Sequence, residues 1–423
     1  MQIGNLLKAI GPGIIFASMA IGVSHLVQST RAGAMYGFGL LGLILLTNLL
    51  KYPFFEYAAR YANATGESLI DGYFKMGRWV LWGYFLLTVT SMFFVMAAVG
   101  VVTAGFLDNL FGVGNLLWVT IGLFLFGLIL LVVGKYKTLD SLIKVIGGVL
   151  LVSTLIAFVL ALAHGPQAKG ADLLPYINWA DGKTILFLIA LMGWMPTAVD
   201  MSTWTSLWTV ERIKQTGYHP TLKESLFDFN FGYIATALLA ICFVTLGAYL
   251  MYGTGVETAT SSSVFANQVV EMYTKTIGKW SYWIVAASAF SIMFGTSISV
   301  MDGYARVLER TTELLFLSQK DAKKALDDQR FYNASIVILL IGAFAILYYM
   351  LFWKKNPNGF KALVDLATTI SFLIAPFVAV VNYLLVTSKD FPEGARPKPW
   401  MRVLSWLGIL FLTGFSIYFL WVK

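Results

Sequence analysis

The sequence predicts an all-α membrane protein with eleven transmembrane helices, two of them discontinuous. Hydrophobic residues make up 58% of the 423 residues and charged residues 12%, which is about half of the ~25% usual in soluble domains. Many stretches that lack Asp, Glu, Lys and Arg are as long as the ~20 residues that a helix needs to cross a bilayer. Two hydrophobic segments are also interrupted near their middles, where a continuous helix is not expected.

Eleven apolar segments follow one another along the chain. Their expected ranges are residues 11–33, 37–62, 79–107, 110–134, 140–164, 182–210, 228–252, 280–306, 332–353, 361–387 and 402–422. The second segment contains Lys51 and Glu56 with Pro53 between them. We expect these two charges to be paired within the protein or to reach the membrane surface along their stems.

The first and sixth segments contain the two interruptions. The first is broken at residues 22–25, and the sixth at residues 193–197 with Asp200 one turn further on. A broken helix exposes backbone N–H and C=O groups, which is tolerated at membrane depth only where the backbone lines a cavity or is buried in protein. Breaks at corresponding positions of two halves are typical of the substrate site of a secondary transporter.

Interruptions in the first and sixth segments suggest that the chain consists of two halves of five segments each, followed by one extra segment. Because five is an odd number, the second half would cross the membrane in the opposite direction, as in the inverted repeats of many transporters. We therefore expect a first repeat over residues 1–164 and a second over residues 165–390. Residues 391–423 would form a linker and an extra helix.

The distribution of Lys and Arg predicts the orientation. With a cytoplasmic N-terminus, 20 of these residues lie on the cytoplasmic side and 9 on the outer side, as expected in a plasma (inner) membrane. Eleven spans then place the C-terminus outside. The net charge of +8 is scattered over loops instead of forming one patch, which argues against nucleic-acid binding.

Enzyme motifs are missing from the sequence. It contains no HExxH pattern, P-loop, nucleophile elbow or dinucleotide-binding glycine pattern. We expect no enzymatic activity and no cofactor.

Several short motifs occur in a characteristic order. They are Gly11-Pro12-Gly13, Arg31-Ala32-Gly33-Ala34-Met35-Tyr36-Gly37, Thr47-Asn48-Leu49, Ala58-Ala59-Arg60, Thr65-Gly66-Glu67-Ser68-Leu69 and Met195-Pro196. In this order and spacing they resemble the Nramp (natural resistance-associated macrophage protein) family of metal-ion transporters. The resemblance implies an amino acid–polyamine–cation transporter-like fold, alternating access and a divalent metal ion as cargo.

The chain resembles a divergent member of that family, because it departs from the family's metal site. The family's first-helix break reads Asp-Pro-Gly-Asn, whereas residues 22–25 read Gly-Val-Ser-His. The metal-binding Asp is therefore replaced by Gly22. In the sixth helix the Met of the family's Met-Pro-His motif is retained as Met195, but its His is replaced by Thr197.

Two side chains are the candidate metal ligands. The imidazole of His25 can bind Mn, Fe, Zn or Cu and can also carry a proton, although it can equally be a neutral group bonded to helix carbonyls. Met195 offers a soft thioether, or serves only in packing. The remaining candidates for contact with substrate are Gly22, Ser24, Thr197 and the backbone oxygen of Met192.

Two candidates for the coupling ion, H⁺ and Na⁺, follow from the sequence. The resemblance places Phe94 and Ala97 where the family has the third-helix acids used in proton transfer, so His25 is a candidate proton carrier. Alternatively, Thr296 and Ser297 in the eighth segment could bind Na⁺ through their hydroxyls, or pack against neighbouring helices.

Charged residues near these segments suggest gating. Asp200 either faces the cavity, where it would balance His25 or a cation, or caps the second half-helix or pairs with a cytoplasmic Arg or Lys. Asp302 and Arg306 are spaced i, i+4 on one helix face, and we expect an ion pair that acts as a gate latch.

The expected function is a symporter that moves a divalent metal cation. Without an acid at position 22 the cation lacks a counter-charge, and the small Gly22 would leave room for a larger cargo. One alternative is therefore a Na⁺- or H⁺-coupled transporter of an amino acid-like solute or carboxylate, attracted by the half-helix N-termini. Another is a membrane sensor that does not transport. The expected partners are a small ion or solute and the lipid bilayer, the only bound ion would be the transported metal or Na⁺, and a monomer is expected.

Overall fold

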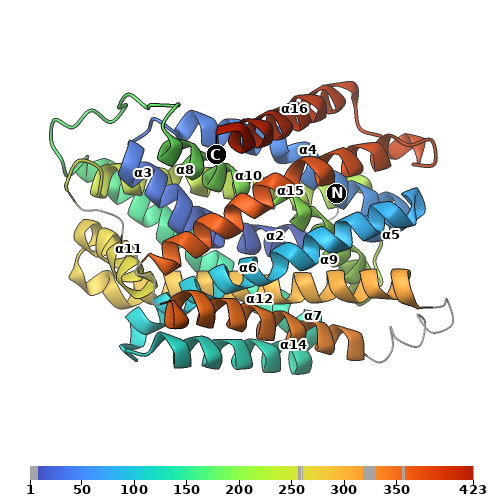
Figure 1. Ribbon diagram of the computed structural model, residues 1–423, viewed down its shortest axis with the longest axis horizontal. Coiled ribbons are helices and arrows are strands. Elements are labelled where there is room, and N and C mark those ends of the chain that lie inside the picture. Colours follow the sequence, from blue (N-terminus) through green and yellow to red (C-terminus); the bar gives the residue numbers. More distant parts are fainter. Residues whose placement is uncertain (1–7, 256–258, 260, 318–328, 355–357, 423) are drawn as a thin grey trace.

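The computed structural model describes residues 8–255, 259, 261–317, 329–354 and 358–422. Within these residues the chain is helical, and no strand occurs. Figure 1 shows the long helices lying side by side in one bundle.

Eight helical stretches of the described residues are long and apolar enough to cross a membrane. They are Pro12–Tyr36 (α2, η1 and α3), Arg78–Phe111 (α6), Leu116–Gly134 (in α7), Leu222–Leu250 (α10), Lys279–Phe316 (η3 and α12), Arg330–Trp353 (α14 and η4), Gly359–Thr387 (α15) and Pro399–Trp421 (in α16). The prediction of a helical membrane protein is confirmed. The exact number of eleven spans stays a prediction.

Three further helices match expected segments but are shorter or more polar. Helix α4 (Leu41–Thr65) carries Lys51, Glu56 and Arg60, all of which are buried. Helices α8 (Gly182–Gly193) and α9 (Ser202–Thr216) are the two halves of the sixth segment. The other described helices, α5 (Leu69–Met76) and α11 (Ser262–Ile277), connect longer ones.

The fourth and fifth expected segments are joined in one helix. Helix α7 runs from Leu116 to His164, whereas the sequence analysis separates residues 110–134 from residues 140–164. The stretch contains no proline, so every residue keeps the N–H that an α-helix needs and no ring blocks the preceding turn.

The first interruption differs from the expected break. Helix α2 (Pro12–Ile21) continues without a gap into the π-helical turn η1 (Gly22–Ser29), and this leads into α3 (Thr30–Tyr36). Because residue 23 is Val and not Pro, its N–H is available and the helix widens instead of opening. Such π segments are often found at functional sites.

The second interruption is a true gap. After α8, residues 194–198 are not helical and include a cis Met195-Pro196 bond. The chain resumes as the short turn η2 (Val199–Met201) and continues as α9. The discontinuity predicted in the sixth segment is confirmed.

Two groups of helices enclose the interrupted segments. In the first group, α10 packs against α2, α3 and α4, and α4 packs against α9. In the second group, α6 packs against α11, α12 and α14. Helix α12 also contacts α2 and η1, so the two groups meet at the first interruption.

The first group is held together by close backbone contact and by aromatic rings. A Cβ atom added at Gly33 of α3 would lie 2.8 Å from the backbone N of Ala248 in α10, and one added at Gly247 would lie 2.9 Å from the backbone N of Ala34. Small residues of this kind allow membrane helices to approach closely. Asp228 of α10 additionally accepts hydrogen bonds from the first backbone N–H groups of α2.

Candidate functional site

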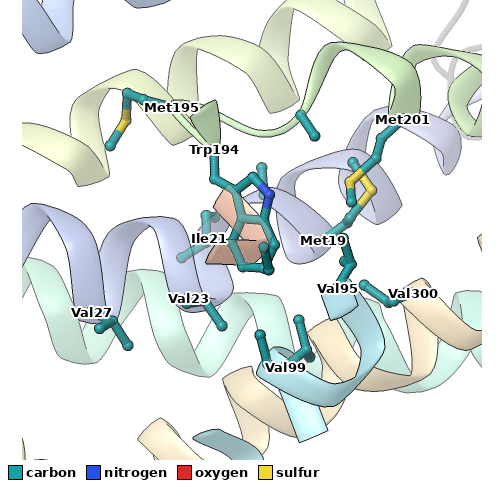
Figure 2. Close-up of a cluster of buried hydrophobic side chains, with 14 of the residues drawn as sticks. Met19, Ile21, Val23, Val27, Val95, Val99, Trp194, Met195, Met201 and Val300 are labelled. Atoms are coloured by element: carbon teal, nitrogen blue, oxygen red, sulfur yellow. The ribbon is translucent and has the colours of Figure 1, made fainter. Parts of the chain in front are cut away.

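A small cavity lies where the two interrupted helices meet. Its volume is about 20 Å³, which exceeds the roughly 10–15 Å³ that one water molecule requires. Figure 2 shows the apolar part of its wall. The first group and the sixth-helix gap contribute Met19, Ala20, Val23, Ser24, Trp194, Thr197 and Met201, and the second group contributes Val95, Val99, Thr296 and Val300.

The polar side-chain groups of the wall residues are neutral: hydroxyls, thioethers and the indole N–H of Trp194, which donates to Ser371. Thr197 Oγ1 donates to Met201 Sδ over 3.2 Å, and Thr296 Oγ1 donates to the carbonyl of Ser18 over 2.8 Å. Met19 and Met201 both line the cavity, and Figure 2 draws their side chains close together. Among the described residues, none with a carboxylate lines the cavity.

Gly22 does not leave the space that the sequence analysis expects. A Cβ atom at this position would lie 2.6 Å from Thr296 Cγ2 and 2.7 Å from Thr296 Cβ. The expectation of extra room for a larger cargo is wrong, because the side chain of Thr296 from α12 fills it. The same contact leaves no room for an Asp at position 22.

His25 forms a bridge between the π-helical turn and α10. Its Nε2 lies 2.9 Å from the carbonyl oxygen of Thr236, and its Nδ1 lies 2.7 Å from Ser24 Oγ. Its Nδ1 also lies 2.9 Å from the carbonyl oxygen of Ala20. A neutral ring carries one N–H and can donate to only one of the two carbonyls. The side chain is fully buried and is absent from the cavity wall, so its predicted roles in metal binding and proton transfer rest on the sequence alone.

Met195 is also buried away from the cavity wall. Figure 2 shows its thioether pointing away from Trp194 and the valines. Of the two predicted metal ligands, neither lines the cavity. The sequence analysis overlooked Met19 and Met201, which do. Met201 stands four residues after Thr197, and in the continuous helix that a hydrophobic segment suggests this spacing would place both on one face.

The gap in the sixth helix holds a charged group that the sequence analysis did not assign to the site. The Lys51 ammonium group donates to the carbonyl oxygens of Met192 at 2.5 Å, Gly193 at 2.9 Å and Thr197 at 3.2 Å. The backbone oxygen of Met192, predicted to face substrate, is therefore bonded to Lys51. The expected pairing of Lys51 within the protein is confirmed.

Asp200 lies beside this charged group in η2. It is buried and interacts electrostatically with Lys51. Its Oδ1 atom has no hydrogen-bond partner among the described residues, and its side chain does not cap α9. Asp200 is not among the residues that line the cavity, and its role in balancing a cation stays a prediction.

The predicted ion pair on α12 is confirmed. Arg306 Nε lies 2.8 Å from Asp302 Oδ2. Asp302 also accepts hydrogen bonds from Trp208 of α9 and Tyr332 of α14, each over 2.7 Å, and Arg306 approaches Glu211 of α9 at 3.6 Å. The pair therefore joins three helices, while its role as a latch stays a prediction. Ser297 is buried outside the cavity wall.

Metal-binding clusters of the usual kind are not present in the described part of the chain. No three side chains of His, Cys, Asp or Glu come together there. Besides the His25 imidazole and the Asp200 carboxylate, the described residues of the two interruptions offer hydroxyls, thioethers and backbone carbonyls.

The family model described as natural resistance-associated macrophage protein-like matches residues 13–422. The uncharacterized protein PM0681 of Pasteurella multocida is 34% identical over 420 residues, which cover 97% of this chain and 92% of that protein. The divalent metal cation transporter MntH of Levilactobacillus brevis is 21% identical over 428 residues, which cover 98% of this chain and 88% of the transporter.

Solved structures show the same fold. An Eremococcus coleocola manganese transporter, in complex with an aromatic bis-isothiourea substituted compound, matches with a TM-score of 0.68 at 16% identity, over 98% of this chain and 86% of that one. MhsT in complex with L-phenylalanine matches with a TM-score of 0.63 at 14% identity, over 96% and 98%. With a family model that covers nearly its whole length, the chain belongs to the Nramp family of membrane transporters and not to a family of enzymes.

Proposed function

We propose that the chain is a secondary active transporter that carries a divalent metal cation through the central cavity. The observation that carries this proposal is a cavity the size of a single water molecule, lined by oxygen and sulfur donors, where both interrupted helices meet. Relatives over almost the full length are named divalent metal cation transporters. The cavity size favours a single ion over a larger solute.

The metal would bind to neutral donors. Thioethers suit softer transition metals, and hydroxyl and carbonyl oxygens suit Mn²⁺ and Mg²⁺. We assign Met19 and Met201 to the cargo, together with the hydroxyls of Ser24 and Thr197. The sequence-based alternative is a site at His25 and Met195.

Transport would proceed by motion of the first helix group against the second. The cavity wall takes residues from both groups, so a change in their relative position would open it. In this proposal residues 1–164 and 165–390 are inverted repeats, the N-terminus is cytoplasmic, the protein lies in the inner membrane, and one chain suffices for transport.

Uptake of Mn²⁺ into proteoliposomes tests the cargo, with Mg²⁺ and Ca²⁺ as competitors. We expect saturable uptake by the wild type and a loss of at least tenfold in Met201→Leu, because one lost ligand of about 1.4 kcal/mol changes affinity tenfold. Met195→Leu is the matched control, since it removes a buried thioether outside the cavity wall. Uptake lost in Met195→Leu but kept in Met201→Leu would place the metal at the sequence-based site instead.

The proposed coupling ion is H⁺, carried by His25. Its support is a buried imidazole at the first interruption and the lack of acids at positions 94 and 97. We expect His25→Gln to abolish the dependence of uptake on a pH gradient. An unchanged dependence would favour the alternative, Na⁺ binding at Thr296 and Ser297, which a response of uptake to a Na⁺ gradient would reveal.

A second candidate function is transport of a small organic solute. It is favoured by the neutral cavity wall, since a double charge at low dielectric is costly without a counter-charge. The cavity would have to widen for such a cargo. Uptake of amino acids or carboxylates in a Na⁺ or H⁺ gradient, without Mn²⁺ uptake, would support it. Binding of a ligand without any flux would identify a sensor.

A further inference from the structure

The Lys51 side chain ends in a site with the chemistry of a cation-binding site. Its Nζ atom is surrounded by the carbonyl oxygens of Met192, Gly193 and Thr197 at 2.5–3.2 Å. An ammonium group has three N–H donors and no acceptor. Three acceptors therefore meet three donors, and the hydrogen-bonding capacity of the group is fully used.

The position of these carbonyls adds electrostatic attraction. Met192 and Gly193 end helix α8, where the last carbonyls have no partner in a continuing helical turn and the helix carries partial negative charge. Asp200 follows the gap and interacts electrostatically with Lys51. Lys51 itself is fully buried in α4, so bulk water does not solvate its charge.

A lysine whose stem only filled space would not need three carbonyl acceptors around its ammonium group. An unbranched apolar side chain could take the place of the Lys51 stem, but the carbonyls of Gly193 and Thr197 have no other hydrogen-bond donor among the described residues. The Met192 carbonyl also accepts from the backbone N–H of Met195, over 3.4 Å. A buried acceptor left without a partner costs about 1–3 kcal/mol. The charge, and not the stem, is therefore the part of the side chain that the gap requires.

We propose that the Lys51 ammonium group is a covalently tethered cation that fills a monovalent-cation site in the sixth-helix gap. In the wild type this site is closed to soluble ions, and the Met192 carbonyl does not take part in binding the cargo. When the ammonium group is removed, the site accepts a soluble cation in its place. This concerns the gap itself and holds whichever cargo the central cavity carries.

Thermal unfolding of the purified full-length protein in detergent tests the proposal, at constant ionic strength with choline chloride as the reference salt. Lys51→Met lacks the ammonium group but keeps most of the stem. We expect its Tm to lie below that of the wild type and to rise saturably, on the order of 5 °C, with NH₄⁺ or Na⁺. Lys51→Ala, which also lacks the stem, should respond to n-propylammonium.

The wild type and Lys75→Ala serve as controls and should show no such rise. Lys75 is an exposed lysine that pairs with Glu67. If Lys51→Met matches the wild type in Tm, or if neither Lys51 variant responds to these cations beyond the controls, the proposal is overturned. If Lys51→Ala does not fold in any salt, the response of Lys51→Met decides. Mn²⁺ uptake is a separate measurement, so a failure of the proposed cargo leaves this result unaffected.

Discussion

At the scale of single residues, one contact explains why the first interruption lacks an acid. Gly22 of η1 touches Thr296 of α12 so closely that even a methyl group at position 22 would overlap it. Thr296 is held in place because its hydroxyl donates to the carbonyl of Ser18. Neither side of the contact can move freely.

We expect Gly22→Ala to lower the stability of the protein by about 1–3 kcal/mol, the usual cost of overpacking. Thermal unfolding in detergent measures the effect. Gly42→Ala is the control, because a Cβ atom there meets nothing within 4 Å. Equal stability of the two variants would contradict the prediction. Thr296→Gly has a cost of its own, so Gly22→Ala should lower the stability less in the Thr296→Gly background than in the wild type.

The site residues were predictable only where their partners are near in sequence. Asp302 and Arg306 are four residues apart, and helical geometry alone pairs them. Lys51 lies 141 residues before Met192, so its charge was visible in the sequence but its partners were not. The contact between Gly22 and Thr296 was hidden for the same reason, and with it the shape of the cavity.

At the scale of helices, the first group is built around α10. Its backbone touches α3 through Gly33 and Gly247, while Asp228 caps α2 and the carbonyl of Thr236 accepts from His25. These contacts fix α2, η1 and α3 to α10 along their length. The whole first segment should therefore move together with α10.

Gly247→Ala should disrupt this attachment, because its Cβ atom would meet the backbone of α3 and not a flexible side chain. We expect a loss of stability of about 1–3 kcal/mol, measured by thermal unfolding. Gly122→Ala in α7, where a Cβ atom has open space, provides the comparison. A Gly247 variant as stable as the Gly122 variant would show that α3 and α10 can separate at little cost.

Most helices were predictable, because charge-free length is a strong signal for membrane spans. The exceptions have physical causes. The residues between the fourth and fifth expected segments include charged side chains but no proline that would stop a helix, so α7 continues through them. The first interruption was expected as a break at residues 22–25, yet without a proline there the backbone forms π-helical turns.

At the scale of the whole molecule, ion pairs connect helices that are far apart in the sequence. Arg31 of α3 binds Asp365 of α15 at 2.8 Å. Arg306 of α12 joins Asp302 and Glu211 as described above, and Arg310 of α12 binds Asp71 of α5. Any movement of α12 relative to α5 and α9, or of α3 relative to α15, would have to separate these pairs.

Replacing Arg306 by Gln leaves the buried Asp302 carboxylate without its cation. We expect a loss of about 3 kcal/mol, at the lower end of the range for one broken partner of a buried pair because Trp208 and Tyr332 still donate to Asp302. Thermal unfolding measures it, and Arg306→Gln combined with Asp302→Asn should recover part of the loss. If the loss of stability in the double variant equalled the sum of the losses in Arg306→Gln and Asp302→Asn, the two residues would not act as a pair.

The contact between Gly22 and Thr296 also constrains how this protein could have changed over evolutionary time. An acid cannot enter position 22 by one substitution, because the intermediate would carry two overlapping side chains. Position 296 would have to become smaller first, and that step would remove the hydroxyl bonded to Ser18 before any benefit of the acid was available. The order of substitutions therefore matters, and a lineage that acquired this contact would be held away from the acidic form of the site by packing alone.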